Sequence, residues 1–182
     1  MAEDTRIFDL LITQATLAND ADGYAQAHYD RVRHGTPFAL TAGIGLARKC
    51  TSIAPTPHLT AMAQNDLAIA LQEQSTRTAG PEGADLLAEA VESYRAALCV
   101  FTDADHPVDW AMIQGNLANV EKARAAHDSA PDPRPHLEAA LAHVQNALRV
   151  YDPAHMSYDH GSATQLRNNI QAALDALSSS SS

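Results

Sequence analysis

Apolar residues recur along much of this chain with the three- and four-residue spacing of helices that bury one face. The segments 87–101 and 158–177 each carry a single apolar stripe. The segment 110–120, WAMIQGNLANV, differs because its apolar residues form no single stripe, which predicts a helix packed between neighbours. The two stripes consist of Leu87, Ala90, Val91, Tyr94, Ala97, Leu98 and Phe101, and of Ala163, Leu166, Ile170, Ala173, Leu174 and Leu177.

Proline- and glycine-rich stretches separate the helical segments, and the β-branched runs that mark strands are absent from the sequence. The pattern therefore predicts an all-α fold. We expect Thr36 and Pro37 to begin a helix, and the serine-rich residues 178–182 to be disordered. The expected helices cover residues of about 5–18, 22–33, 37–51, 57–76, 83–102, 107–126, 134–151 and 158–177.

A repeat with a fixed offset of 50 residues organises these helices into pairs. AMAQNDLA at 61–68 matches AMIQGNLA at 111–118, and the same offset aligns 87–101 with 137–151. An unchanged offset in separate segments is diagnostic of a repeat architecture. We expect one domain over residues 1–177, with units at about 5–51, 57–102 and 107–151 and a capping helix at 158–177.

Two segments resemble the tetratricopeptide repeat (TPR), in a long-helix bacterial variant whose units are longer than the usual length of about 34 residues. They are DWAMIQGNLANV at 109–120 and LLAEAVESYRAAL at 86–98. The resemblance implies a right-handed helical-repeat (TPR-like) stack of antiparallel helix pairs with a C-terminal capping helix. It also implies that the first helix of each pair lines a concave groove, which binds a peptide or a partner protein.

Charge and composition narrow the class of partner. Hydrophobic residues make up 46% of the chain and aromatic residues 5%, which favours helices rich in Ala and Leu. The formal net charge of −10 argues against nucleic acid and anionic membranes as partners. The first residues lack the plan of a signal peptide, and no apolar run approaches the roughly 18 residues of a membrane span. We therefore expect a cytoplasmic protein, in which Cys50 and Cys99 are small buried hydrophobes.

Amides on the first helices stand at positions that the resemblance assigns to peptide binding. Asn116 is the clearest, and Asp66 takes its place one unit earlier. A carboxylate there argues against a clamp for a C-terminal carboxylate, and the alternative is that the amides are structural. The residues expected to line the groove are Asp66, Ile69, Gly115, Asn116, Asn119, Lys122, Arg167 and Asn169.

Two residues of WAMIQGNLANV carry different signals. The glutamine recurs at the same register in every unit, so we interpret it as a repeated structural strut. The glycine does not recur, and it indicates either a close approach of two helices or room for a ligand. Function is therefore expected at the positions that do not repeat. The recurring residues are Gln14, Gln64 and Gln114, and the non-repeating residues are Gly115, Asn116 and Asn119.

The sequence contains no catalytic motif, phosphate-binding loop or dinucleotide-binding glycine pattern. The segments 103–109 and 152–160 combine His and Asp, but their spacing matches no known metal-ligand signature. We interpret their aspartates Asp105, Asp109 and Asp159 as helix caps. No catalytic residue, metal or cofactor is predicted.

Three functions remain open at this point. The first is a non-catalytic protein–protein interaction module that binds a peptide or partner protein in its groove. The second is a small-molecule-binding protein, or an unorthodox enzyme, that uses the groove as a pocket. The third is a scaffold that acts by self-association as a homo-oligomer.

Overall fold

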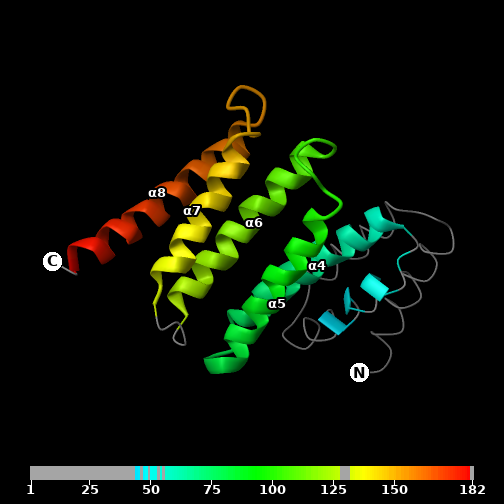
Figure 1. Cartoon of the computed structure of the whole chain (residues 1–182), viewed down its shortest axis with the longest axis horizontal. Helices are drawn as coiled ribbons and strands as arrows, with labels where there is room; N and C mark the ends of the chain where they lie inside the picture. The colour runs from blue at the N-terminus through cyan, green and yellow to red at the C-terminus, as the bar shows by residue number, and fades with distance from the viewer. Residues whose placement is uncertain are drawn as a thin grey trace.

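The computed structural model describes residues 44, 45, 47, 48, 50–52, 54, 56–127 and 132–180, and over these residues the chain is helical with no strand (Figure 1). The helices expected at 5–18 and 22–33, together with Gln14 and the Thr36–Pro37 pair, lie outside the described residues. The described helices are α4 (Pro57–Ser75), α5 (Gly80–Leu98), α6 (Pro107–Ala126), α7 (Arg134–Leu148) and α8 (Ser157–Ser180).

The spacing of 50 residues seen in the sequence also sets where the helices begin and end. The first helices α4, α6 and α8 begin at Pro57, Pro107 and Ser157, and the second helices α5 and α7 end at Leu98 and Leu148. The turn after each second helix repeats as well. Phe101 N donates to Ala97 O at 3.0 Å, and Tyr151 N donates to Ala147 O at 3.1 Å. Equivalent residues therefore adopt equivalent backbone conformations.

The helices pack in neighbouring pairs, α4 with α5 and α6 with α7, and α8 covers the open side of the second pair (Figure 1). The first helices also contact one another, α4 with α6 and α6 with α8, whereas α5 and α7 do not touch. Helix α6 is therefore surrounded by α4, α5, α7 and α8. This arrangement explains why its apolar residues do not form one stripe, and the predicted packing between neighbours is confirmed.

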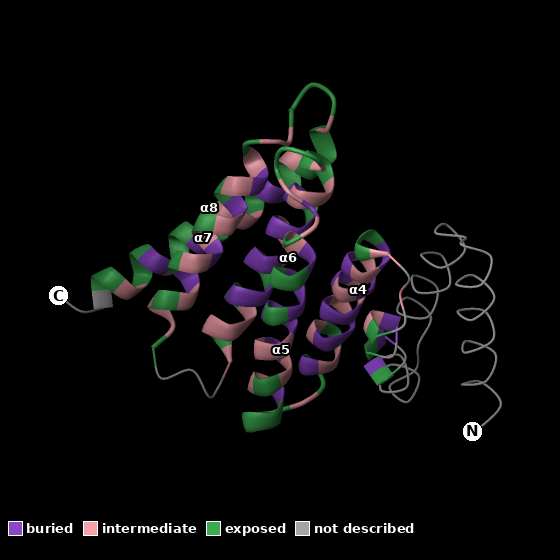
Figure 2. Ribbon diagram, turned by 45° about the vertical axis from the view of Figure 1, so that its right-hand side comes forward, coloured by how far each residue is buried: buried purple, intermediate pink, exposed green. Residues whose placement is uncertain are grey.

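The core follows the predicted apolar stripes. The stripe of 87–101 is buried except for the half-buried Leu98, and Ile170 and Leu174 of α8 are buried against α7. One face of α8 is exposed (Figure 2). Gln165, Asn168 and Gln171 are exposed residues of this helix. A single apolar face on the last helix is confirmed.

Several helix ends differ from the prediction. Helix α5 begins at Gly80 rather than near residue 83, because Pro81 suits the first turn of a helix. It ends at Leu98 rather than near residue 102, and α7 likewise ends at Leu148 rather than near 151. At these two ends the carbonyls of Ala97 and Ala147 each accept hydrogen bonds from the backbone N–H groups three and four residues later in the chain. The three-residue bond tightens the last turn.

Two other expectations are wrong in part. Cys50 is buried as expected, but Cys99 is exposed, because it follows the end of α5 and falls between positions of the apolar stripe. The serine segment is not separate from the last helix, since α8 continues to Ser180. There the hydroxyl of Ser178 donates to Leu174 O at 3.0 Å and accepts from the guanidinium of Arg134 at 3.3 Å.

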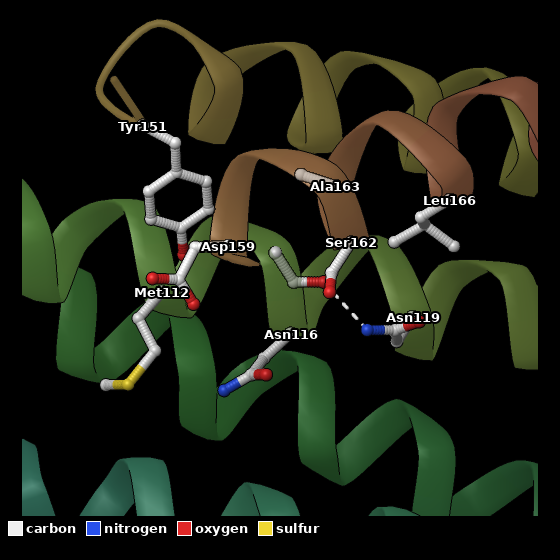
Figure 3. A pocket seen from close by; sticks show the side chains of 9 residues that line it. Met112, Asn116, Asn119, Tyr151, Asp159, Ser162, Ala163 and Leu166 are labelled. Atoms are coloured by element: carbon white, nitrogen blue, oxygen red, sulfur yellow. Dashed lines mark hydrogen bonds between the residues drawn. The ribbon is translucent and has the colours of Figure 1, made fainter. Parts of the chain in front are cut away.

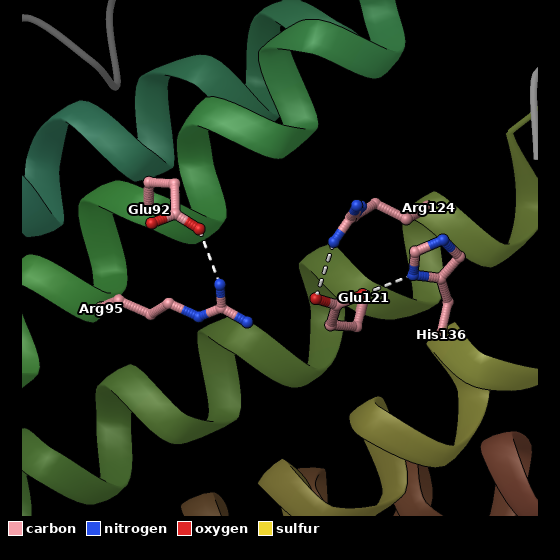
Figure 4. Close-up of polar contacts among 5 residues, drawn as sticks. All are labelled: Glu92, Arg95, Glu121, Arg124 and His136. Carbon is pink, nitrogen blue, oxygen red and sulfur yellow. Dashed lines mark hydrogen bonds and ion pairs between the residues drawn. The ribbon is translucent and has the colours of Figure 1, made fainter.

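A buried carboxylate on α6 helps to join it to α7. Glu121 is only 3% exposed, yet both of its oxygens have partners. Arg124 Nη1 donates to Oε1 at 3.0 Å, and Nδ1 of His136 lies 2.8 Å from Oε2 (Figure 4). Because a buried charge is stable only when paired, this contact favours one placement of the two helices.

A buried amide makes a second polar contact between the same helices. Gln114 Oε1 lies 2.7 Å from Nδ1 of His143 and accepts from Asn146 Nδ2 at 3.5 Å, so Gln114 is a structural contact between α6 and α7, but the predicted repetition of this role is wrong. The role is not repeated one unit earlier, where Gln64 makes no described side-chain hydrogen bond. Its partners are missing because Ser93 and Ala96 stand at the equivalent positions.

Acidification is predicted to destabilise the fold through His143. Burial lowers the pKa of this imidazole below its ordinary 6.5, with Arg95 reinforcing and Glu121 opposing the shift. The unfolded chain therefore takes up a proton first as pH falls below about 6.5, and folding stability is lost from there through the lower folded pKa.

Urea unfolding at pH about 7.5 and about 5, on either side of the ordinary histidine pKa, measures this effect. His143→Gln keeps a donor for Gln114 but cannot titrate in this range, so it should lose less stability than the wild type. Equal losses in the two proteins would show that His143 is not responsible.

Candidate functional site

A pocket of about 310 Å³ opens between the first helices α6 and α8 (Figure 3). Its volume is at the lower end of the range for small-molecule pockets, about 300–1,000 Å³. Helix α6 forms one wall, and the N-terminal half of α8 forms the other. Tyr151, which follows α7, closes one side. The lining residues are Met112, Gly115, Asn116, Asn119, Tyr151, Asp159, Ser162, Ala163 and Leu166.

Three of the predicted groove residues meet at this pocket: Gly115, Asn116 and Asn119. Asn119 lies about one turn along α6 from both Gly115 and Asn116, so the three residues border the same side of the helix. The Asn119 amide donates to Gly115 O at 3.2 Å, whereas the Asn116 side chain makes no hydrogen bond with a described residue (Figure 3). The donor and the acceptor of Asn116 are therefore both available to a ligand.

The role of Gly115 is resolved by its surroundings. A Cβ atom added at this position would meet one side-chain atom within 4 Å, the hydroxyl of Tyr151 at 3.9 Å. This distance is an ordinary van der Waals contact, so the glycine is not required for a close approach of helices. It provides room in the pocket instead.

The other five predicted groove residues do not line the pocket. Ile69 packs against the core, and Asp66 is half-buried on α4. Burial raises the pKa of Tyr94, and the charge of Asp66 adds to this shift. Arg167 is half-buried and donates to the neighbouring Asn168. The remaining two, Lys122 and Asn169, are exposed on α6 and α8, beyond the pocket toward the C-terminal ends of those helices.

Sequence reasoning missed most of the second wall. Tyr151 ends the aligned segment 137–151, where the repeat indicates no site, and the sequence favours a capping role for Asp159. Met112 belongs to the apolar residues of a helix predicted to be packed between neighbours, but it is 42% exposed. The repeat contains a signal that could have found part of this wall, because some of the pocket residues are smaller than the side chains at the equivalent positions of the preceding unit.

The size difference is clear at three positions of the repeat. One unit earlier, the equivalent positions hold larger side chains, and two of these are buried. Because the backbone repeats while the side chains shrink, space is left between α6 and α8. Gly115, Ser162 and Ala163 stand 50 residues after Asn65, Met112 and Ile113.

The pocket has one acidic side and no basic lining residue. Asp159 is the sole charged residue among those that line it, and its carboxylate makes no hydrogen bond or ion pair with a described residue. Burial raises the pKa of Tyr151 to about 12, and the nearby charge of Asp159 contributes to the shift. The phenol therefore stays neutral and can both donate and accept hydrogen bonds.

Large exposed hydrophobic residues gather at the same end of these helices. Val108 is 52% exposed and lies one turn before Met112 on α6, while Tyr158 is 82% exposed and precedes Asp159 on α8. We call Val108, Met112 and Tyr158 the apolar rim. They are the large hydrophobic side chains that are exposed in the part of the chain that the structure describes.

The His/Asp segments are used mainly for local contacts. Asp152 pairs with His155 at 2.5 Å, and this contact lowers the pKa of the carboxyl group.

Asp105 accepts from the Thr102 hydroxyl and does not cap α6, so the capping interpretation is wrong for this residue. Asp109 and Asp159 lie in the first turns of α6 and α8, where the helix dipole favours a negative charge, but neither carboxylate accepts a hydrogen bond from a described residue, so neither caps its helix. Within the described ranges, no three potential ligands gather as a metal site would require.

No protein-family model, curated protein or solved structure matches the chain. The described helices also include none that is long and apolar enough to cross a membrane.

Gly115→Ala is predicted to stabilise the protein by about 0.5–1 kcal/mol, because alanine restricts the unfolded chain and the pocket has room for a methyl group. Thermal or urea unfolding measures the change.

Gly83→Ala provides the matched control. A Cβ at Gly83 would collide with the backbone carbonyl of Thr78 and approach His127, so this variant should be destabilised. If Gly115→Ala were destabilised to the same extent, Gly115 would be a packing residue and the interpretation of the pocket would be wrong.

Proposed function

We propose that this protein is a non-catalytic interaction module, built as a TPR-like stack, that binds a peptide segment of a partner protein. The segment would lie across the first helices α4, α6 and α8 and place one side chain in the pocket between α6 and α8. The observation that carries the proposal is that this pocket forms where the repeat departs from itself, at Gly115 on one wall and Ser162 and Ala163 on the other.

The packing of the helices supports a surface on this side. The first helices touch one another while α5 and α7 do not, as expected when the first helices lie on the inner side of a curved stack. Such inner surfaces are extended and suit a peptide. The Asn116 amide has an available donor and acceptor, which is the pair that an extended peptide backbone requires.

The pocket chemistry favours binding over catalysis. Ser162 is the one lining residue with an aliphatic hydroxyl, and no histidine or lysine lines the pocket to activate it. Asp159 lines the same pocket but has no described hydrogen bond to that serine. The polar groups are arranged to hold a ligand.

Binding of a small molecule in the same pocket is a second candidate function. Its volume of about 310 Å³ and its mixed polar and apolar lining favour this alternative. The two functions differ in extent, because a peptide would also contact the α4 and α6 surface outside the pocket.

A peptide-display selection on the full-length protein, followed by titration of the selected peptide, tests the proposal. Gly115→Asn places in the pocket the residue found one unit earlier, and we expect it to weaken binding by at least about tenfold. Gly161→Asn is the matched control, since Gly161 is exposed on α8 with open space around it. Its affinity should equal that of the wild type.

The proposal fails if no peptide is selected, or if Gly115→Asn binds as tightly as the control. Circular dichroism of both variants verifies that they are folded. Selection failure combined with a bound metabolite in native mass spectrometry would favour the small-molecule alternative.

A further inference from the structure

We infer that the pocket between α6 and α8 takes a cationic side chain, a lysine or arginine of the bound segment, with an apolar residue beside it. This inference rests on the proposed function and adds the chemistry of the residue that is recognised.

The first argument is charge. The pocket is lined by one carboxylate, Asp159, and by no basic side chain. Neither of the nearest histidines in sequence, His155 and His160, lines the pocket, and His155 pairs with Asp152. An anionic ligand group would be repelled by Asp159. A purely apolar group would remove water from this carboxylate without replacing the lost hydrogen bonds.

The position of Asp159 in the first turn of α8 would, alone, be explained by the helix dipole. The helix dipole does not explain the other polar residue beside this carboxylate. Tyr151 comes from the turn after α7 and directs its hydroxyl toward the same space, beside the carboxylate (Figure 3). Burial keeps this phenol neutral, as its raised pKa of about 12 indicates. A neutral hydroxyl beside a carboxylate can accept a hydrogen bond from a cation.

The second argument is the number of acceptors. Asp159, Tyr151, Ser162 and Asn116 all carry oxygen atoms that line the pocket. A lysine ammonium offers three donors and an arginine guanidinium five, with no acceptor on either group. Each of the four lining groups can accept a hydrogen bond, so together they can satisfy the donors of either cation.

The third argument is the apolar lining. Met112, Ala163 and Leu166 line the pocket next to the polar groups, and they suit the methylene stem of a lysine or arginine. The apolar rim continues from Met112 to Val108 and Tyr158 outside the pocket. This surface would bind the apolar neighbour of the basic residue. The net charge of −10 also favours encounter with a basic segment.

Fluorescence anisotropy with four labelled peptide pools tests the inference on the full-length protein. Each pool has a fixed central residue, which is Lys, Arg, norleucine or Glu, between degenerate apolar positions. We expect the Lys and Arg pools to bind at least about tenfold more tightly than the norleucine pool, with the Glu pool weakest. Added salt should reduce this preference.

Asp159→Asn should abolish the preference for Lys and Arg over norleucine while retaining the shape of the pocket. Asp175→Asn is the matched control, because it removes the same charge from an exposed position of α8 outside the pocket. The control should keep the preference of the wild type.

The outcomes separate the two proposals. If all pools bind equally, or if Asp159→Asn keeps the preference, the inference of a cationic side chain is wrong while peptide binding stands. If no pool binds, the inference as stated and the proposed function both fail. A last experiment is ligand-observed NMR with Nα-acetyl-lysine methylamide, whose side-chain ammonium remains charged. If this compound binds while the pools do not, the pocket recognises a small cationic molecule instead of a peptide.

Discussion

The burial of α6 among four other helices is the constraint on which the rest of this structure depends. A helix in that position can leave few side chains in contact with solvent, so its sequence is apolar on several sides. Its two buried polar residues, Gln114 and Glu121, are acceptable because partners on α6 and α7 satisfy them. These contacts fix α6 in place, and the pocket residues are carried on the side that faces α8.

The pocket results from a repeating backbone with side chains that do not repeat. Helices placed at equal intervals leave equal spaces between the first helices, and those spaces must be filled or left open. One unit earlier, two of the positions equivalent to pocket residues hold the larger and buried Asn65 and Ile113. Between α6 and α8 the same positions hold Gly115 and Ala163, and an opening remains. Departures from the repeat are thus a physical guide to where such a protein can bind something.

Much of the fold could be predicted from the sequence because it depends on local pattern. The starts of α4 and α6 at prolines, and the apolar stripe of α5, are properties of short segments. The exposure of Cys99 depends instead on the last turn of α5, which the stripe does not reveal. The pocket was predictable on the α6 wall only. Tyr151 and Asp159 reach it from a turn and another helix, so their meeting depends on tertiary packing.

The central claim is that a ligand enters between α6 and α8, and methionine methyl groups can report this directly. Met112 lines the pocket, whereas Met62 occupies the same register one unit earlier and does not. With methyl-labelled methionine, NMR spectra of the full chain are recorded while a selected lysine-containing peptide is added. The account predicts that the Met112 signal shifts more than the Met62 signal, because only Met112 lines the pocket. A shift of Met62 with Met112 unmoved would contradict it.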